Sequence, residues 1–77
     1  MEPLDQHVGR RIRGKRRALG MSAESVAAGL GIETMRLLAY ERGSEGVPPD
    51  HLERLSRILD VPLTYFFPRQ SLVSCGA

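Results

Sequence analysis

The sequence predicts an all-α domain, a compact bundle of four helices plus a short fifth, on three observations. Apolar residues recur at helical spacing in four segments, glycines and prolines separate those segments, and no segment shows the alternation of a strand. At 77 residues the chain holds one domain at most. Chains this short bury only about 60% of the surface that their unfolded state exposes, so we expect no deep substrate cleft.

The first helix is expected to be apolar on one face and basic on the other. Its apolar positions, at about 3.6-residue spacing, are Leu4, Val8, Ile12 and Leu19. The positions opposite are Arg10, Arg13 and Arg17. Gly14 lies inside this helix and should cost about 1 kcal/mol relative to alanine. Gly20 suits the left-handed cap that commonly ends a helix.

Residues 22–42 are expected to form two short amphipathic helices separated by a tight turn. Ser22 is a favourable N-cap for the first helix of this pair. Gly31 supplies the positive φ that the turn requires. The second helix of the pair covers about residues 33–42, and its inward residues are Leu37 and Tyr40.

Prolines bound the next helix. Pro48 and Pro49 can open a helix but cannot continue one, so a fourth helix should follow them. It should end at Asp60, and its apolar face consists of Leu52, Leu55, Ile58 and Leu59.

A final helical turn is expected over residues 63–67, closed by Pro68. Its aromatic residues are Tyr65, Phe66 and Phe67. They either close the core under the first helix or contribute in part to a dimer contact. We therefore place the domain at residues 8–67, after an N-terminal lead-in over 1–7 and before a flexible tail over 68–77.

Basic side chains are concentrated in the N-terminal quarter of the chain. Residues 1–20 carry six basic and two acidic side chains, a net charge of +4, whereas residues 21–77 carry five basic and seven acidic ones, a net charge of −2. Basic charge gathered on one element indicates a polyanionic partner. From charge alone, a solvated helix face explains it equally well.

Composition argues against several classes of protein. No apolar run approaches the roughly 20 residues of a membrane span, and the N-terminus lacks the apolar core of a signal peptide, so we expect no membrane association and a cytoplasmic location. A single cysteine, Cys75, cannot form a disulfide framework. His7 and His51 stand alone, so surface or capping roles, and no metal or cofactor, are expected. No nucleophile–base pair or paired carboxylates are present, so we expect no enzyme.

Many residues fall in the order and spacing of a known family. They are Val8-Gly9, Arg11-Ile12-Arg13, Arg16, Gly20-Met21-Ser22, Glu24, Ala27, Leu30-Gly31-Ile32, Leu37, Tyr40-Glu41-Arg42-Gly43, Pro48, Leu52, Leu55, Leu59 and Val61. This pattern resembles the phage-repressor (Cro-type, or XRE) helix-turn-helix family of transcriptional regulators over about residues 8–67. The resemblance implies a lambda-repressor-like DNA-binding domain, with the helix-turn-helix motif at about 22–42.

The resemblance also implies how double-stranded DNA is contacted. Family members place the recognition helix, about 33–42 here, in the major groove, and the preceding helix across the backbone. The positions expected to meet phosphates are Arg13, Arg17, Ser22, Ala23, Arg42 and Ser44. At Ser22 a helix N-terminus would offer free N–H groups to a phosphate, whereas Ala23 replaces a glutamine that is common in the family.

Two further positions correspond to a structural contact rather than a DNA contact. Arg16 and Glu41 match positions that in this family often form a buried ion pair between the first and third helices. Removing one partner of such a pair strands a charge and costs about 3–5 kcal/mol.

The outward face of the recognition helix departs from the family pattern because it is largely apolar. The base-reading candidates are Thr34, Met35, Arg36, Leu38 and Ala39. In one interpretation the apolar residues contact thymine methyl groups while Arg36 reads a guanine. In a second, the Met35/Leu38/Ala39 face docks a protein instead. In a third, the helical register is shifted by one and Leu38 belongs to the core.

The leading hypothesis is a small, sequence-specific, DNA-binding transcriptional regulator from a bacterium or phage, acting as a homodimer on an operator, with repression as the simplest mechanism. Two-fold pairing would account for a palindromic operator. The alternative is a helix-turn-helix scaffold reused as a protein-interaction module, such as an antitoxin or anti-regulator.

Overall fold

The computed structural model describes residues 3–68, and every regular element in that range is helical. In order, they are α1 (Leu4–Ala18), α2 (Ala23–Leu30), α3 (Thr34–Arg42), α4 (Pro49–Ile58) and the single 3-10 turn η1 (Leu63–Phe66). This confirms the predicted bundle of four helices plus a short fifth. None of these helices combines the length and apolar character of a bilayer span.

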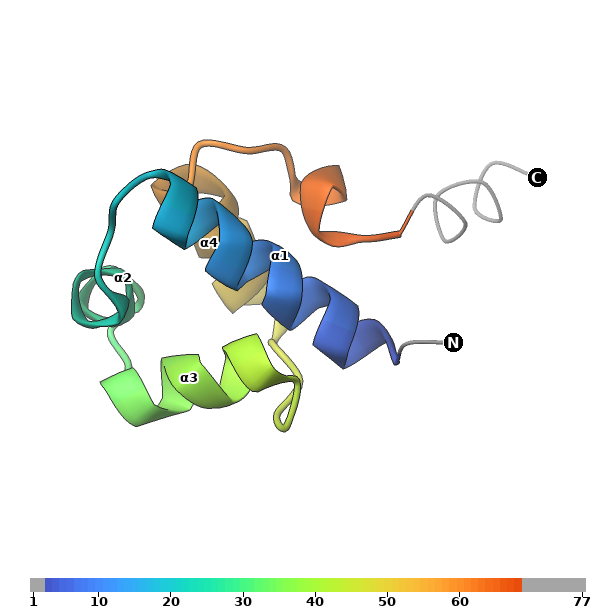
Figure 1. Ribbon diagram of the computed structural model, residues 1–77, viewed down its shortest axis with the longest axis horizontal. Helices are drawn as coiled ribbons and strands as arrows, with labels where there is room; N and C mark the ends of the chain where they lie inside the picture. Colours follow the sequence, from blue (N-terminus) through green and yellow to red (C-terminus); the bar gives the residue numbers. More distant parts are fainter. Residues whose placement is uncertain (1–2, 69–77) are drawn as a thin grey trace.

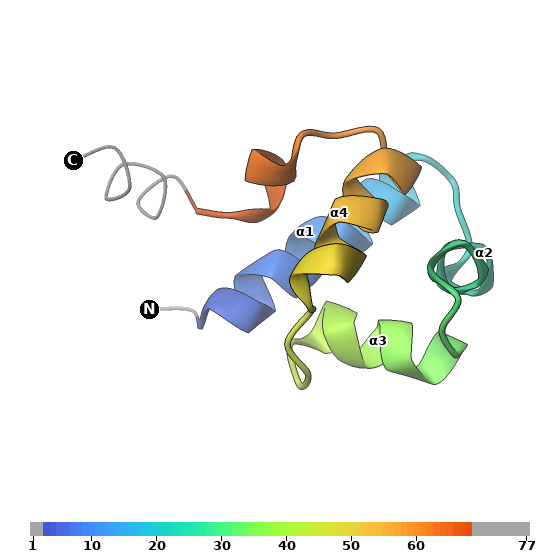
Figure 2. The ribbon, with the colours of Figure 1, turned by 180° about the vertical axis from the view of Figure 1, so that it is seen from behind.

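α1 is the central element of the bundle (Figure 1). It contacts α3 along one side and η1 along another, while α4 packs against α2 and η1. The opposite view shows α4 in front of α1, with α2 at one end of the molecule and α3 along its edge (Figure 2). The pair α2 and α3 therefore lies at one end and one edge of the bundle, where a flat partner can reach it.

The core draws on all five elements. Its fully or nearly fully buried side chains are Val8, Ile12, Val26, Ala27, Leu30, Leu37, Tyr40, Leu52, Leu55, Leu59 and Phe66. Tyr65 and Phe67 are half-buried against this core, so the aromatic cluster does close it below α1.

Two of the four residues predicted for the apolar face of α1 lie outside the core. Leu4 is 48% and Leu19 46% exposed, because Leu4 opens the helix beyond the core and Leu19 is its C-cap. Met21, in the loop that follows, packs against the core. The helix also begins earlier than the domain boundary that the sequence indicated, so residues 4–7 of the lead-in are helical.

Two glycines set the geometry of the bundle. A Cβ on Gly9 would stand 2.6 Å from the carbonyl oxygen of Glu41, so α1 can approach the end of α3 only with glycine there. Gly31 has φ 73° and ψ 32°, the left-handed conformation expected of the turn between α2 and α3. Of the expected tail only Pro68 is described, and residues 69–77, with Cys75, lie outside the described residues.

Candidate nucleic-acid interface

The two helices of the motif are fixed by capping and by one half-buried corner residue. The Ser22 hydroxyl accepts a hydrogen bond from the Ser25 amide at 3.0 Å, which is the N-cap expected for α2. After Gly31, the Ile32 amide donates to the Ala27 carbonyl at 3.0 Å, and the Ile32 side chain packs against the core. Glu33 caps α3 without a side-chain hydrogen bond.

The outward face of α3 has the predicted register. Leu37 and Tyr40 are completely buried, whereas Leu38 and Ala39 are half-buried and Met35 is 66% exposed. The interpretation that placed Leu38 in the core through a shifted register is therefore wrong. Of the remaining candidates, Arg36 and Arg42 are exposed and Thr34 is half-buried.

Arginines from two helices meet beside this face. A hollow of about 350 Å³ lies between α1 and α3 and is lined by Arg13, Arg16, Arg17, Leu38, Glu41 and Arg42. Arg13, Arg17 and Arg42, all expected to meet phosphates, are exposed there. Residues separated by up to 29 positions in the chain thus form one cationic flank of α3, which we call the basic hollow.

The fourth arginine of the basic hollow, Arg16, stabilises the fold. Arg16 Nε donates to Glu41 Oε2 at 2.7 Å and Nη2 donates to Oε1 at 3.1 Å, so the expected ion pair between α1 and α3 is present. Arg16 Nη1 also donates to the Met21 carbonyl at 3.0 Å. The hydrogen bond to Glu41 raises the pKa of Arg16, against the lowering effect of burial.

The other predicted phosphate positions differ in the hydrogen-bond donors that they can present to a phosphate. Ser22 is exposed at the start of α2, where the first backbone N–H groups of a helix have no carbonyl partner within the helix. Ala23 is half-buried and packs against the core, so only its backbone is left to meet a phosphate. The Ser44 hydroxyl donates to the Ala39 carbonyl at 3.2 Å, so its proton is already used in a hydrogen bond at the end of α3.

Sequence reasoning missed an ion pair on the reading helix. Arg36 Nε donates to Glu45 Oε2 at 2.8 Å, across the turn at Gly43, and both side chains remain accessible to solvent. No pattern in the sequence pointed to Glu45, because the two residues are nine positions apart and meet only through the turn.

The expectation of a surface or capping role for His51 was wrong. Its Nδ1 lies 3.0 Å from the Tyr40 hydroxyl and shares a hydrogen bond with it, which joins α3 to α4. The contact gives the buried phenol a polar partner.

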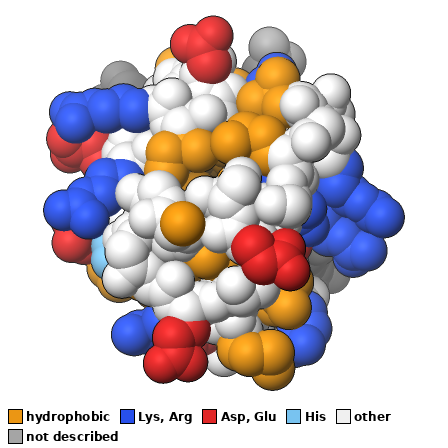
Figure 3. Space-filling view, turned by 90° about the vertical axis from the view of Figure 1, so that its left-hand side faces the viewer, with side chains coloured by type: hydrophobic (Ala, Val, Ile, Leu, Met, Phe, Trp, Pro, Cys, Tyr) orange, Lys and Arg blue, Asp and Glu red, His pale blue; other side chains and the backbone are white. Residues whose placement is uncertain are grey.

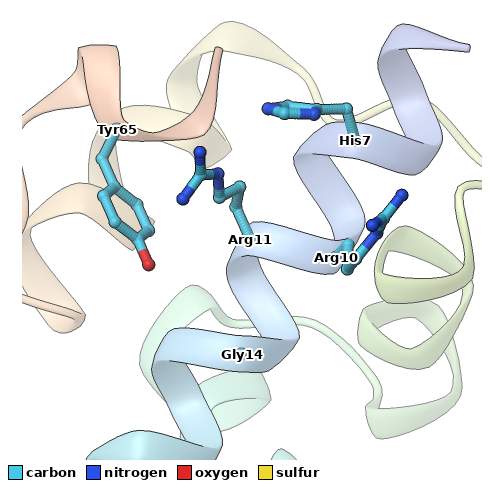
Figure 4. A pocket seen from close by; sticks show the side chains of 5 residues that line it. All are labelled: His7, Arg10, Arg11, Gly14 and Tyr65. Carbon is cyan, nitrogen blue, oxygen red and sulfur yellow. The ribbon is translucent and has the colours of Figure 1, made fainter. Parts of the chain in front are cut away.

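A second cationic region lies on the opposite flank of α1. Figure 4 shows His7, Arg10, Arg11 and Gly14 of α1 with Tyr65 of η1 around a hollow of about 370 Å³. The Arg11 guanidinium lies 5.1 Å from the centroid of the Tyr65 ring, a cation–π contact that ties η1 to α1. Arg11 thus stabilises the fold on the side of α1 away from α3.

At the α2 end of the molecule, the basic side chains lie in two separate groups (Figure 3). In Figure 3, basic side chains gather at the right, the side of α1, and at the left, the side of α4. Hydrophobic side chains form separate patches between them, interrupted by acidic groups. The face is therefore amphipathic, with its strongest positive charge beside α1.

A capped helix pair on an all-α bundle, with one solvent-facing helix and a cationic flank, defines a domain of the helix-turn-helix class. The sequence profile of the helix-turn-helix family matches residues 12–66. The chain belongs to this family, of the XRE type, which confirms the resemblance.

Named relatives agree with this assignment. An uncharacterized HTH-type transcriptional regulator of Sinorhizobium medicae is 45% identical over 65 residues, covering 84% of this chain and 47% of the relative. An uncharacterized transcriptional regulator in the ATPase CF(0) region of Rhodospirillum rubrum is 36% identical, covering 83% of this chain and 59% of its own length. The chain spans about half the length of the curated relatives that it matches.

Solved structures share the fold. The restriction-modification controller protein C.AhdI from Aeromonas hydrophila is 29% identical and superposes with a TM-score of 0.75, covering 80% of this chain and 94% of that one. The clp gene regulator ClgR from C. glutamicum is 20% identical, with a TM-score of 0.81 over 86% of each chain. At that identity the second similarity concerns the fold alone.

Proposed function

We propose that this chain is a sequence-specific DNA-binding regulator that lays α3 in the major groove of an operator. The observation that carries the proposal is the basic hollow, where Arg13 and Arg17 of α1 and Arg42 of α3 gather on one flank of the outward helix. Phosphates line both edges of the major groove. A helix in that groove with this flank against one strand would pair three guanidinium groups with its backbone.

The second strand would meet the start of α2. Ser22 and the first amides of α2 present N–H groups at a helix N-terminus, which attracts phosphate through its dipole. Between the two strands, Met35, Leu38 and Ala39 would contact thymine methyl groups, and Thr34 and Arg36 would supply hydrogen bonds. Base reading by this set remains our proposal.

A DNA titration at two salt concentrations, about 50 and 200 mM, tests it. Binding of random duplex DNA should weaken steeply with salt because counterions are released. Arg13→Ala, Arg17→Ala and Arg42→Ala should each weaken binding and reduce the salt slope by about 1. Arg57→Ala is the matched control: Arg57 lies on α4, is exposed, and pairs only with Glu53 among the contacts observed in residues 3–68. Salt-independent or absent binding at micromolar protein would exclude this function.

A second function has support from one specific observation. Met35 is 66% exposed at the centre of the α3 face, and Arg36 is held by Glu45. An apolar, partly neutralised face suits a protein partner, as in an antitoxin or anti-regulator. Met35→Ser separates the two functions: a DNA reader would keep its salt-dependent affinity and change its base preference, whereas a protein-docking face would have no DNA affinity to keep.

Assembly and location complete the proposal. We propose that the chain acts as a homodimer in the bacterial cytoplasm, since an operator-binding protein must reach the chromosome and a palindromic site matches a two-fold axis. Repression by covering a promoter is the simplest mechanism for a domain of this size.

A further inference from the structure

Arg36 is held on one side of α3 by a carboxylate of this chain. Its Nε donates to Glu45 Oε2 at 2.8 Å. Glu45, followed by Tyr40, raises the pKa of Arg36. Tyr40 is the inward residue that contacts His51 of α4. The Arg36 guanidinium therefore lies on the α4 flank of α3, opposite the basic hollow.

The surroundings of this pair are acidic overall. A shallow hollow of about 530 Å³ is lined by Gly31, Ile32, Glu33, Arg36 and Glu45, so one guanidinium stands among two carboxylates. The positive charge of Arg36 is thus neutralised locally, whereas the guanidinium groups of Arg13, Arg17 and Arg42 share their hollow with only one carboxylate, Glu41, which Arg16 neutralises.

The pair is exposed enough to be exchanged for another partner. The side chain of Arg36 is 53% and that of Glu45 39% exposed, so water and other acceptors can reach both. Exposed ion pairs contribute little net stability. A guanine edge offers the same chemistry as the carboxylate, two acceptors in one plane, and can replace it.

We propose that Glu45 is a specificity-determining residue of the DNA interface, whose carboxylate competes with the bases for Arg36. Arg36 then reads DNA only where acceptors in the major groove replace Glu45, and weaker acceptor arrangements leave the internal pair closed. This inference rests on the proposed DNA-binding function and deepens it. Glu45 could instead hold Arg36 in position for base contact. Competition is favoured because the bond to Glu45 keeps Arg36 on the α4 flank, away from the centre of the outward face at Met35.

The test is a set of substitutions measured on one duplex. That duplex is first selected from random DNA by the unaltered chain. Glu45→Gln keeps the shape of the side chain and removes its charge, and it should tighten binding about two- to fivefold, the range of an exposed ion pair. In the Arg36→Ala background the same substitution should give no more than half of that gain on a logarithmic scale. Glu53→Gln is the control, since it removes a paired and more exposed carboxylate on α4.

Selection of bound sequences gives a second, independent result. Glu45→Gln should increase the frequency of guanine at one position of each half-site, and the increase should vanish in the double variant. Circular dichroism checks that each variant is folded. We expect all of them to fold, because the substituted side chains are accessible to solvent.

Each other outcome overturns the proposal. Weaker binding by Glu45→Gln would mean that Glu45 braces Arg36. If Glu45→Gln raised DNA affinity equally with and without Arg36, Glu45 would only repel phosphates. If Glu53→Gln raised affinity as much as Glu45→Gln, the effect would come from net charge alone. If the unaltered chain shows no salt-dependent binding, the proposed function itself fails, a result distinct from normal binding that Glu45→Gln leaves unchanged.

Discussion

Glu41 is the one buried charged residue among the described residues 3–68, at 7% exposure, and its two carboxylate oxygens both accept from Arg16. Burying a carboxylate is tolerable only while that partner is present. The same guanidinium also holds the Met21 carbonyl, so one side chain joins α1, the following loop and α3.

Arg16→Ala should lower the free energy of unfolding by about 3 kcal/mol, the lower part of the range for a broken buried pair, because Arg16 itself keeps some exposure. Urea unfolding followed by circular dichroism measures it. Arg13→Ala, an exposed neighbour on the same helix, should change stability by about 0.5 kcal/mol or less. Equal stability for the two variants would contradict a structural role for the pair.

At the scale of elements, α1 crosses the end of α3 closely because Gly9 lacks a side chain. Gly9→Ala would push a methyl group against the Glu41 carbonyl and should destabilise the fold by about 1–3 kcal/mol, although alanine favours helix. Gly14→Ala is the matched comparison in the same helix, with no atom within 4 Å of the added carbon, and should stabilise by up to about 1 kcal/mol. Thermal unfolding of both variants should give melting temperatures shifted in opposite directions.

The N-terminus of α2 allows stability and DNA binding to be separated. Ser22→Ala removes the cap to the Ser25 amide and should cost about 1 kcal/mol, whereas Ser22→Asp should keep the cap. On DNA, Ser22→Asp should bind more weakly than the unaltered chain, because a carboxylate would face the phosphate proposed to lie there. Unfolding curves and DNA titrations of both variants measure the two effects. Tight binding by a stable Ser22→Asp chain would remove α2 from the interface.

The elements were predictable because their signals are local. Helical spacing of apolar residues, the cap at Ser22 and the turn at Gly31 lie within a few residues of the structure they specify. Leu4 and Leu19 share the apolar spacing of α1 but lie outside the core, because the periodicity continues past the point where the core ends. The contacts Arg36–Glu45 and Tyr40–His51 depend on how a loop and a second helix are placed, which spacing along the chain does not encode.

For the whole molecule, the size of α3 limits what one copy can recognise. Nine residues at 1.5 Å each give a helix of about 13 Å, which spans roughly four base pairs. A genome offers on the order of a million or more competing sites, and a four-base-pair sequence recurs far too often to specify one operator. The molecule measures 38 × 24 × 22 Å, so two copies can lie side by side in successive major grooves, about 34–36 Å apart.

We therefore expect the selected operator to hold two related half-sites with centres one helical turn apart, about 10–10.5 base pairs, and to bind two chains. Native mass spectrometry of the complex gives the stoichiometry. Scrambling one half-site should reduce affinity by roughly a hundredfold, because the second copy then loses its linked contact. The duplex keeps its length and phosphate number, so a general electrostatic effect would leave affinity almost unchanged. A complex of one chain per duplex, with undiminished affinity for a single half-site, would show that the chain reads DNA alone and that residues beyond α3 must widen its contact.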